Sequence, residues 1–507
     1  MMNKNLFKLK LILLVFLSFP SFAKISPSEY LKKVTKIIEN GNYVLGSREL
    51  YRLSRGSLYK HKIIQIKYTL GIAFLEMRLY HLASLQFVYI IRRDKKGKYK
   101  SKSIEKLSLI LDHFGDDSLF CSLSKDIKEY EYPSNVSSRM HFYFGKCAFY
   151  KKQYAKARFH FRKINSNSPD SNKAIYYRAL SYAEENQVSR SADLFRELSD
   201  TSTNVTATNR VAALMGLARV LYQGEQFEDS IKIYRSIPKD TPYFYDSLLE
   251  NSWNYLRSGK FRSALSNFQS LHSPFYNNRY QPESLILRAF IYLYICKYYE
   301  LEKVLDFFKV VYKPVLKDIE RSLSYNSSYL DYVKAILDSK KGNGLRLSSG
   351  ASNLPAVVVD RITRNDRFNS KIAYLLKLKE EKDVLNSLAP EWKSDRVGRN
   401  AFYMINRRID STQKLAGKEV KKVLLEVRDE LKRLSLSEKY LRYDVLKGKR
   451  EILKKKISNK YLEQIQIDEE TSRSFYIQNG YEYWLFKGEA WLDEIGNYHY
   501  LGQQNCE

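Results

Sequence analysis

The chain has 507 residues and a formal net charge of +30, with 44% hydrophobic residues and only 11 prolines. This length accommodates two or more domains, and the composition suits a large helical core. The seven histidines are scattered, and the sequence contains no zinc-protease, nucleophile-elbow, phosphate-loop or dinucleotide-binding motif. We therefore expect a protein that is not an enzyme, with no catalytic residue, no cofactor and no metal ligand.

The N-terminus has the pattern of a secretory signal peptide. Three lysines precede an apolar run at residues 11–19, and the small residues Ser21 and Ala23 follow it. A membrane span needs about 20 apolar residues, so the run favours a cleaved leader at residues 1–23 over a permanent anchor. The expected product is an exported protein that begins near Lys24, in the periplasm or cell envelope of a bacterium. A eukaryotic secretory route is the alternative that the signal leaves open.

The strongly basic balance bears on the class of partner. A charge of +30 is typical of nucleic-acid binding, but export argues against that partner. Anionic envelope surfaces, such as phospholipid head groups or acidic polysaccharides, are the better electrostatic match for an exported basic protein. A solvated lysine-rich surface without a specific ligand is the alternative that stays open.

The first helices after the leader carry clear start signals. Ser26-Pro27-Ser28-Glu29 has the form of a capping box with proline at the first helical position, and it predicts a helix that runs toward Asn40. Gly46, Leu50 and Leu53 then fit a degenerate first helix pair, and residues 104–132 fit another. The region therefore begins with irregular helix pairs.

From Gly71 to Leu305 a pattern of small residues and aromatics recurs. Gly145 is followed by Ala157 and Phe161, and small residues of the same kind stand 34 residues apart in several units. Small residues let two helices approach closely, and an aromatic one turn later fills the space between neighbouring pairs. Polar turns fall between the helices, at residues 151–153, 223–225 and 258–260.

This spacing resembles the tetratricopeptide repeat (TPR), whose unit is an antiparallel helix pair of about 34 residues. The resemblance implies an all-α, TPR-like α-solenoid over residues 24–317, with a concave surface that binds a segment of a partner protein. Residues beside the small positions are the candidates for lining that groove. They are Tyr143, Lys146, Tyr150, Arg178, Arg219, Tyr222, Asn251, Asn254 and Arg288.

Four cysteines, Cys121, Cys147, Cys296 and Cys506, would meet an oxidising compartment after export. None belongs to a CxxC pair, and none has a histidine at metal-ligand spacing. Cys121 and Cys147 lie in adjacent helical units, where they can form a disulfide or remain buried free thiols. Both states are left open by the sequence.

A different composition begins after the repeats. Residues 318–398 are predicted to be a helical connector with a Gly/Ser-rich loop at 342–355, and residues 399–470 a long basic helix. Leucines and valines repeat along this helix at spacings of four and three, as a heptad stripe does. The stripe would dock a partner or a second copy as a coiled coil, or it would pack onto the chain's own C-terminal region.

The tail, residues 471–507, is aromatic and punctuated by glycines. Its cluster is Tyr483, Trp484, Phe486, Trp491 and Tyr498. The segment resembles the closing segment of exported TPR proteins of predatory and gliding bacteria, including those grouped with adventurous gliding motility. An exposed cluster would contact protein or glycan, whereas the structural alternative is a folding latch against the long helix.

Together these features predict a non-enzymatic envelope scaffold that binds partner proteins through a TPR groove. The resemblance of the tail implies a role in a motility or surface-assembly complex. Two other functions remain in view. One is a cell-wall glycan-associated module that uses the basic, aromatic C-terminal region, and the other is a hydrolase or transferase within residues 355–507.

Overall fold

The computed structural model describes residues 26–94, 97–115, 118–200, 205–276, 279–324, 328–339, 354–457 and 490–500. Every regular element in these ranges is a helix, which confirms the predicted all-α class. The predicted signal peptide lies outside them, as do residues 342–353 of the Gly/Ser-rich loop and most of the aromatic tail.

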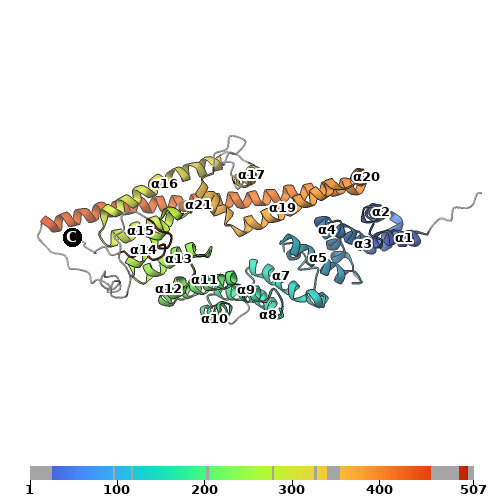
Figure 1. Ribbon diagram of the computed structural model, residues 1–507, viewed down its shortest axis with the longest axis horizontal. Helices are drawn as coiled ribbons and strands as arrows, with labels where there is room; N and C mark the ends of the chain where they lie inside the picture. The colour runs from blue at the N-terminus through green and yellow to red at the C-terminus, as the bar shows by residue number, and fades with distance from the viewer. Residues whose placement is uncertain are drawn as a thin grey trace, which may run out of the picture.

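Most of the first 324 residues form antiparallel helix pairs that stack into an arc (Figure 1). The pairs are α1 (Pro27–Glu39) with α2 (Tyr43–Arg55), α3 (Ile63–Glu76) with α4 (Tyr80–Arg93), α7 (Ser137–Tyr150) with α8 (Tyr154–Arg162), α9 (Ser171–Ala183) with α10 (Val188–Ser199), α11 (Ala207–Gln223) with α12 (Phe227–Arg235), α13 (Phe244–Arg257) with α14 (Phe261–Leu271), and α15 (Pro282–Tyr294) with α16 (Tyr298–Ser324). This arrangement is a TPR-like α-solenoid. In it, α16 continues past residue 317, so the boundary expected there falls inside a helix.

The predicted start of α1 is confirmed atom by atom. The Ser26 hydroxyl accepts a hydrogen bond from the Glu29 amide at 3.2 Å, and the Glu29 carboxylate accepts one from the Ser26 amide at 3.1 Å. Both bonds satisfy backbone donors that have no partner inside the helix. The helix ends at Glu39 with Asn40 as its C-cap.

The small residues of the repeat pattern are required by close packing within each pair. A Cβ at Gly145 would lie 2.6 Å from the ring of Phe161, which leaves no room for any side chain. In a later pair the Ser230 hydroxyl donates to the Ala218 carbonyl at 2.7 Å. The small positions therefore let two helices touch, as the pattern predicted.

The turn inside most pairs has one residue in the left-handed region. These residues are Gly41, Arg78, Lys152, Asn186, Glu225, Gly259 and Cys296, with φ between 58° and 83°. The amide that follows donates to the carbonyl five residues earlier, as Gln153 does to Ala148 at 2.9 Å. This is the hydrogen bond that closes the C-terminus of a helix before a sharp turn. The three predicted turns lie at such positions.

One pair in the arc is irregular. It consists of α5 (Lys100–Phe114) and the short α6 (Ser118–Ser122), with brief 3-10 turns at Glu129–Glu131 and Ser134–Val136. Further 3-10 segments lie at Ser57–Lys62 and Pro274–Tyr276. The irregular pair is tied to the next one by a disulfide between Cys121 and Cys147, whose Cα atoms are 5.5 Å apart. Of the two states that the sequence left open, the structure therefore contains the bridge.

The C-terminal helices are α17 (Tyr329–Ser339), α18 (Ala356–Thr363), α19 (Asp366–Ser387), α20 (Pro390–Ser394) and α21 (Arg396–Ile457). At 62 residues, α21 is roughly 90 Å long. It runs back along the solenoid and packs against α2 and α4 at one end and against α15 and α16 at the other (Figure 1). The C-terminal region is therefore a brace that joins both ends of the arc.

The heptad stripe of α21 is used within the chain. Its buried members include Val420, Leu424, Val427 and Leu431, each fully buried in the core that α21 forms with its neighbouring helices. Glu438, which interrupts the stripe, is buried and forms an ion pair with Arg442. The stripe was predicted either to dock a partner or second copy or to pack onto the chain itself, and the structure shows the second.

At the N-terminal end the brace is fixed by three contacts, which we call the N-terminal clamp. Trp392 is fully buried and its indole N–H donates to the Ser47 hydroxyl at 2.9 Å. Arg48 pairs with Asp395 at 3.0 Å. The buried carboxylate of Glu381, on α19, accepts hydrogen bonds from the first two backbone amides of α4 beyond Tyr80, at 2.8 and 3.3 Å.

Candidate functional site

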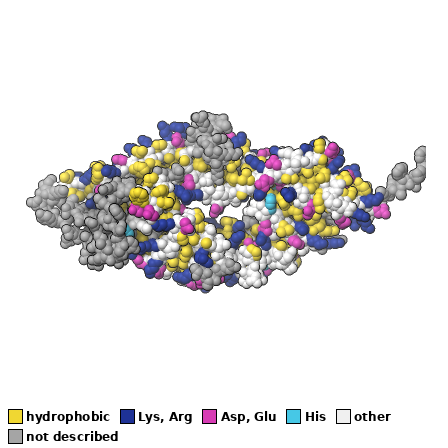
Figure 2. Space-filling view, in the orientation of Figure 1, with side chains coloured by type: hydrophobic (Ala, Val, Ile, Leu, Met, Phe, Trp, Pro, Cys, Tyr) yellow, Lys and Arg dark blue, Asp and Glu magenta, His cyan; other side chains and the backbone are white. Residues whose placement is uncertain are grey.

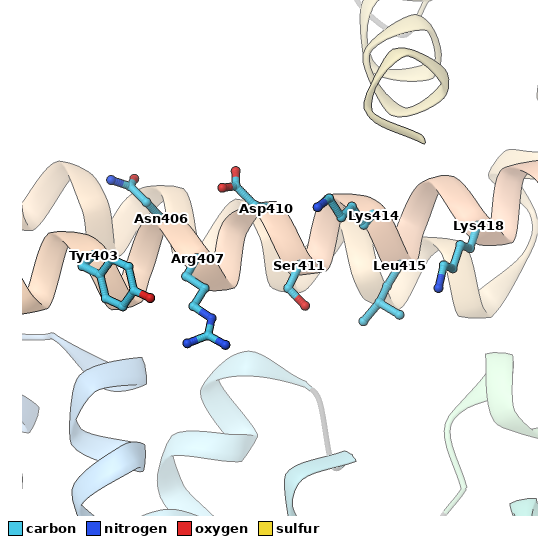
Figure 3. A pocket seen from close by; sticks show the side chains of 8 residues that line it. All are labelled: Tyr403, Asn406, Arg407, Asp410, Ser411, Lys414, Leu415 and Lys418. Carbon is cyan, nitrogen blue, oxygen red and sulfur yellow. The ribbon is translucent and has the colours of Figure 1, made fainter. Parts of the chain in front are cut away.

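A cavity lies along the middle of α21, and part of its lining faces the solenoid (Figure 3). Its volume is about 770 Å³. All of its lining residues belong to α21, and they are Tyr403, Asn406, Arg407, Asp410, Ser411, Lys414, Leu415 and Lys418. In Figure 3 the side chains of Arg407, Ser411 and Leu415 point toward the solenoid helices.

The position of the cavity follows from how α21 is supported. Helices α15 to α20 pack along it, and α2 and α4 meet its first part, whereas no extensive packing joins it to α7 through α12 in the described part of the chain. The first helices of those pairs, α7, α9 and α11, lie on the inner side of the arc (Figure 1). The inner side of these helices therefore faces α21, and we call the region between them and α21 the central opening.

Charge along this cavity is mainly positive. Arg407, Lys414 and Lys418 line the cavity together with one acidic residue, Asp410, and none of these four has an ion-pair partner among the described residues. A smaller cavity of about 450 Å³ adjoins it and adds Lys421. Unpaired cations in a concave site attract an anionic ligand.

The same face also exposes large apolar side chains. Tyr403 is 59% exposed and Leu415 is 42% exposed. They stand twelve positions apart, with Arg407 and Ser411 between them at four-residue steps, so the four side chains follow one side of the helix. The face can therefore offer both apolar contact and charge to a polypeptide.

The groove residues expected from the sequence divide by burial. Tyr150 and Arg219 are exposed, and a further group is partly exposed, namely Lys146, Arg178, Tyr222 and Arg288. Arg219 is engaged with Glu250 on α13 through two hydrogen bonds of 2.8 and 2.7 Å. It therefore joins neighbouring pairs as much as it lines a surface.

Three expected groove residues are buried instead. Tyr143 packs its ring against Phe120, with centroids 5.1 Å apart, and its hydroxyl donates to Asp112. Asn251 is buried, and Asn254 is fully buried with its amide donating to Ser230 at 3.0 Å. These three predictions were wrong because successive side chains are rotated by about 100° around a helix. The repeat pattern did not fix which neighbour of a small residue faces the groove and which faces the core.

The groove residues predicted from the sequence did not include this face of α21. The prediction for α21 used only the heptad stripe, which lies on the opposite side of the helix. A signal was present in the sequence. Tyr403, Arg407, Ser411 and Leu415 are spaced by four, and they precede the first member of the stripe. When a helix carries apolar side chains on a second side as well, both sides are expected to contact other parts of a protein.

The tail cluster is described only in part. Tyr483, Trp484 and Phe486 lie outside the described residues, whereas Trp491 is 60% exposed and Tyr498 is partly buried. Residues 490–500 lie on the solenoid, where the Gly496 amide donates to the Ser270 hydroxyl at 2.8 Å. In this part of the tail the latch is made with α14, rather than with the long helix.

Chemical sites of other kinds were sought in the same residues. No group of histidine, cysteine and acidic residues in the described ranges has the geometry of a metal site. Among the described helices, none combines the length and the apolar character that crossing a membrane requires.

Comparison with protein-family models finds no match, and comparison with curated proteins finds none either. Among solved structures, the chain is similar to one titled "Crystal Structure of P58(IPK) TPR Domain at 2.5 A", with 12% identity over 76% of this chain and 99% of that one. The TM-score is 0.18, so this likeness carries no argument. The TPR-like assignment rests on the helix pairs themselves.

Proposed function

We propose that the chain is a non-enzymatic scaffold of the bacterial envelope that holds a segment of a partner protein in the central opening. The observation that carries the proposal is the inner side of α7, α9 and α11, which faces the brace and which α21 does not contact extensively within the described residues. A solenoid exposes such a surface for binding extended or helical segments.

The charge of the opening indicates the kind of segment. Three unpaired cations and one carboxylate line the cavity on α21, so a partner segment rich in Asp or Glu would gain favourable electrostatics there. Tyr403 and Leu415 would contact apolar residues of the same segment. The proposed partner segment is therefore acidic and amphipathic.

Export is part of the proposal, and two features support it. The N-terminal residues have the pattern of a signal peptide, and Cys121 and Cys147 form a disulfide, a bond that persists mainly in oxidising compartments. A place in a motility or surface-assembly complex rests on the resemblance of the tail alone.

Photocrosslinking in cells tests the central opening. A crosslinking amino acid is placed at Ser411 or Leu415, which point toward the solenoid helices (Figure 3), and in a control at Asp229, an exposed residue of α12. We expect capture of the same partner from both inner positions and not from Asp229. Capture that is equal at all three positions, or absent from the inner two, would refute binding in the opening.

A charge variant tests the chemistry of the partner. Arg407→Gln, Lys414→Gln and Lys418→Gln together remove three positive charges without filling the cavity, and capture from Ser411 should then fall strongly. Lys232→Gln on the outer helix α12 is the control for charge, since Lys232 is exposed. Capture of cell-wall glycopeptide alone would favour the glycan-binding function instead, with the exposed Trp491 as a contact for sugar rings.

A further inference from the structure

A second surface lies on α21 toward its C-terminal end. Here α21 runs antiparallel to α16, and three ion pairs join the two helices: Arg442 with Asp306, Lys449 with Glu302, and Lys432 with Glu320, each at 2.8 Å. These pairs fix the two helices side by side. Their outward sides together form one surface.

The outward side of α21 is unusually apolar for an exposed helix. Five large side chains in its last two dozen residues are between 51% and 67% exposed, and they are Leu436, Tyr440, Tyr443, Leu446 and Leu453. Spacings of four, three and three place the first four along one side of the helix, opposite to the buried Leu441 and Val445. The neighbouring α16 exposes Tyr299, Phe307 and Val310 by 65%, 55% and 71%.

Cations alternate with these apolar side chains. Arg433, Lys439, Lys447 and Arg450 are exposed on α21, and none has an ion-pair partner among the described residues. On the same side of α21, Asp444 is exposed and Glu451 is paired with Lys454.

Most acidic residues of α16 are already engaged in ion pairs. Glu302, Asp306 and Glu320 form the pairs with α21, and Asp318 pairs with Arg321. Four lysines remain exposed, and they are Lys303, Lys309, Lys313 and Lys317. The outward surface is therefore positive, and Figure 2 shows hydrophobic and basic side chains next to each other over α16.

We infer that this surface, which we call the basic apolar face, docks the chain onto an anionic lipid bilayer. Its composition matches that of helices that lie in a membrane interface, where tyrosine and leucine enter the head-group region while lysine and arginine contact phosphates. The face belongs to helices already fixed by packing, so docking requires no folding step.

A second copy of the chain would cover apolar side chains equally well, but it would bring the same cations against each other. Like charges placed across an interface disfavour association. An anionic lipid surface is the occupant that satisfies both the apolar and the basic side chains. The inference does not depend on the partner proposed for the central opening.

Vesicle co-sedimentation of the full chain tests the inference. We expect binding to vesicles of phosphatidylglycerol and phosphatidylethanolamine, weak binding to vesicles of phosphatidylcholine, and a decrease of binding as salt is raised. The triple variant Lys439→Gln/Lys447→Gln/Arg450→Gln should lose affinity on the order of 100-fold, because each basic residue near an anionic surface strengthens binding about fivefold.

Two further variants separate the face from charge in general. Tyr440→Ser/Tyr443→Ser/Leu446→Ser should also weaken binding, although it changes no charge. Lys32→Gln/Lys33→Gln/Lys36→Gln removes three exposed charges from α1, at the other end of the molecule, and should bind as the wild type does. Equal thermal unfolding of the variants and the wild type shows that the fold is kept, since all the changed side chains are exposed or on the surface.

Three outcomes would overturn the inference. The first is no preference for anionic vesicles. The second is an equal loss in the α1 variant, which would mean binding by net charge alone. The third is a dimer in solution that Tyr440→Ser/Tyr443→Ser/Leu446→Ser dissociates while vesicle binding is absent, which would assign the face to a second copy.

Discussion

The middle and the N-terminal end of the solenoid are built from the same kind of helix pair, yet they differ in what faces them. At the end, α2 and α4 are covered by the brace through the N-terminal clamp. In the middle, α7 through α12 have no extensive contact with α21 in the described chain. The repeat pattern therefore sets the stacked helix pairs, while the contacts of the non-repeating helix α21 decide which of those pairs it covers.

The largest expected effect separates the clamp from the open middle. Trp392→Ala removes a fully buried indole and should lower the free energy of unfolding by about 3–5 kcal/mol. Hydrogen exchange should become faster in α2 and α20, and much less so in α11. Trp491→Ala is the matched control, because Trp491 is 60% exposed. Uniform acceleration along the whole arc would contradict a local clamp.

A smaller effect tests packing inside a middle pair. Gly145→Ala places a Cβ 2.6 Å from Phe161 and should cost about 1–3 kcal/mol in a denaturant titration. Gly56→Ala provides the control, since its nearest atoms would lie at 3.5 Å and its φ is −76°. Adding Phe161→Leu to Gly145→Ala should recover part of the loss, and a purely additive double variant would argue against the contact.

The clamp should also respond to pH, because burial raises the pKa of Glu381 to about 8, against the opposing effect of its two backbone hydrogen bonds. The folded chain then holds a proton that the unfolded chain releases above about pH 4.5. Stability should therefore fall as pH rises from there to about 8, by up to about 1.4 kcal/mol per pH unit. Glu381→Gln does not titrate, so its stability relative to the wild type should increase over this range.

Chemical denaturation of both proteins at several pH values measures that difference. His81 lies in the same cluster, and burial together with Arg408 lowers its pKa to about 3. The contribution of neutral His81 to the free energy of unfolding is lost as pH falls below 6.5. Both proteins contain His81, so this contribution cancels in the difference between them. Glu380→Gln is the exposed control and should run parallel to the wild type. Parallel curves for Glu381→Gln would show that the carboxyl group is not responsible.

The smallest effect concerns the turn that middle and end pairs share. Lys152 has a φ of 59°, a conformation that costs an L side chain energy and glycine none. Lys152→Gly should raise stability by a few tenths to about 1 kcal/mol. The reverse change at the equivalent turn, Gly259→Ala, should lower it by a similar amount, as thermal unfolding can measure. Stabilisation by both changes would mean that the turn conformation is not limiting.

Most of the fold could be predicted from short-range patterns. The capping box at Ser26, the close approach at Gly145 and the turns near Lys152 and Gly259 all follow from residues close together in the chain. The candidate site could not be predicted in the same way. Asn254 stands beside a small position, as a groove residue should, and yet it is buried, because helix phase depends on the neighbouring pair.

The all-α class, the helix pairs and their turns follow from the amino-acid sequence, because they depend on interactions within about one repeat of the chain. Tertiary packing sets which side of α21 is buried, where the brace meets the arc and which inner surface α21 leaves uncovered among the described residues. The contacts that set these features join residues far apart, such as Trp392 with Ser47, separated by 345 positions. Helical periodicity shows which face of a helix is apolar, but it does not show which distant helix covers that face.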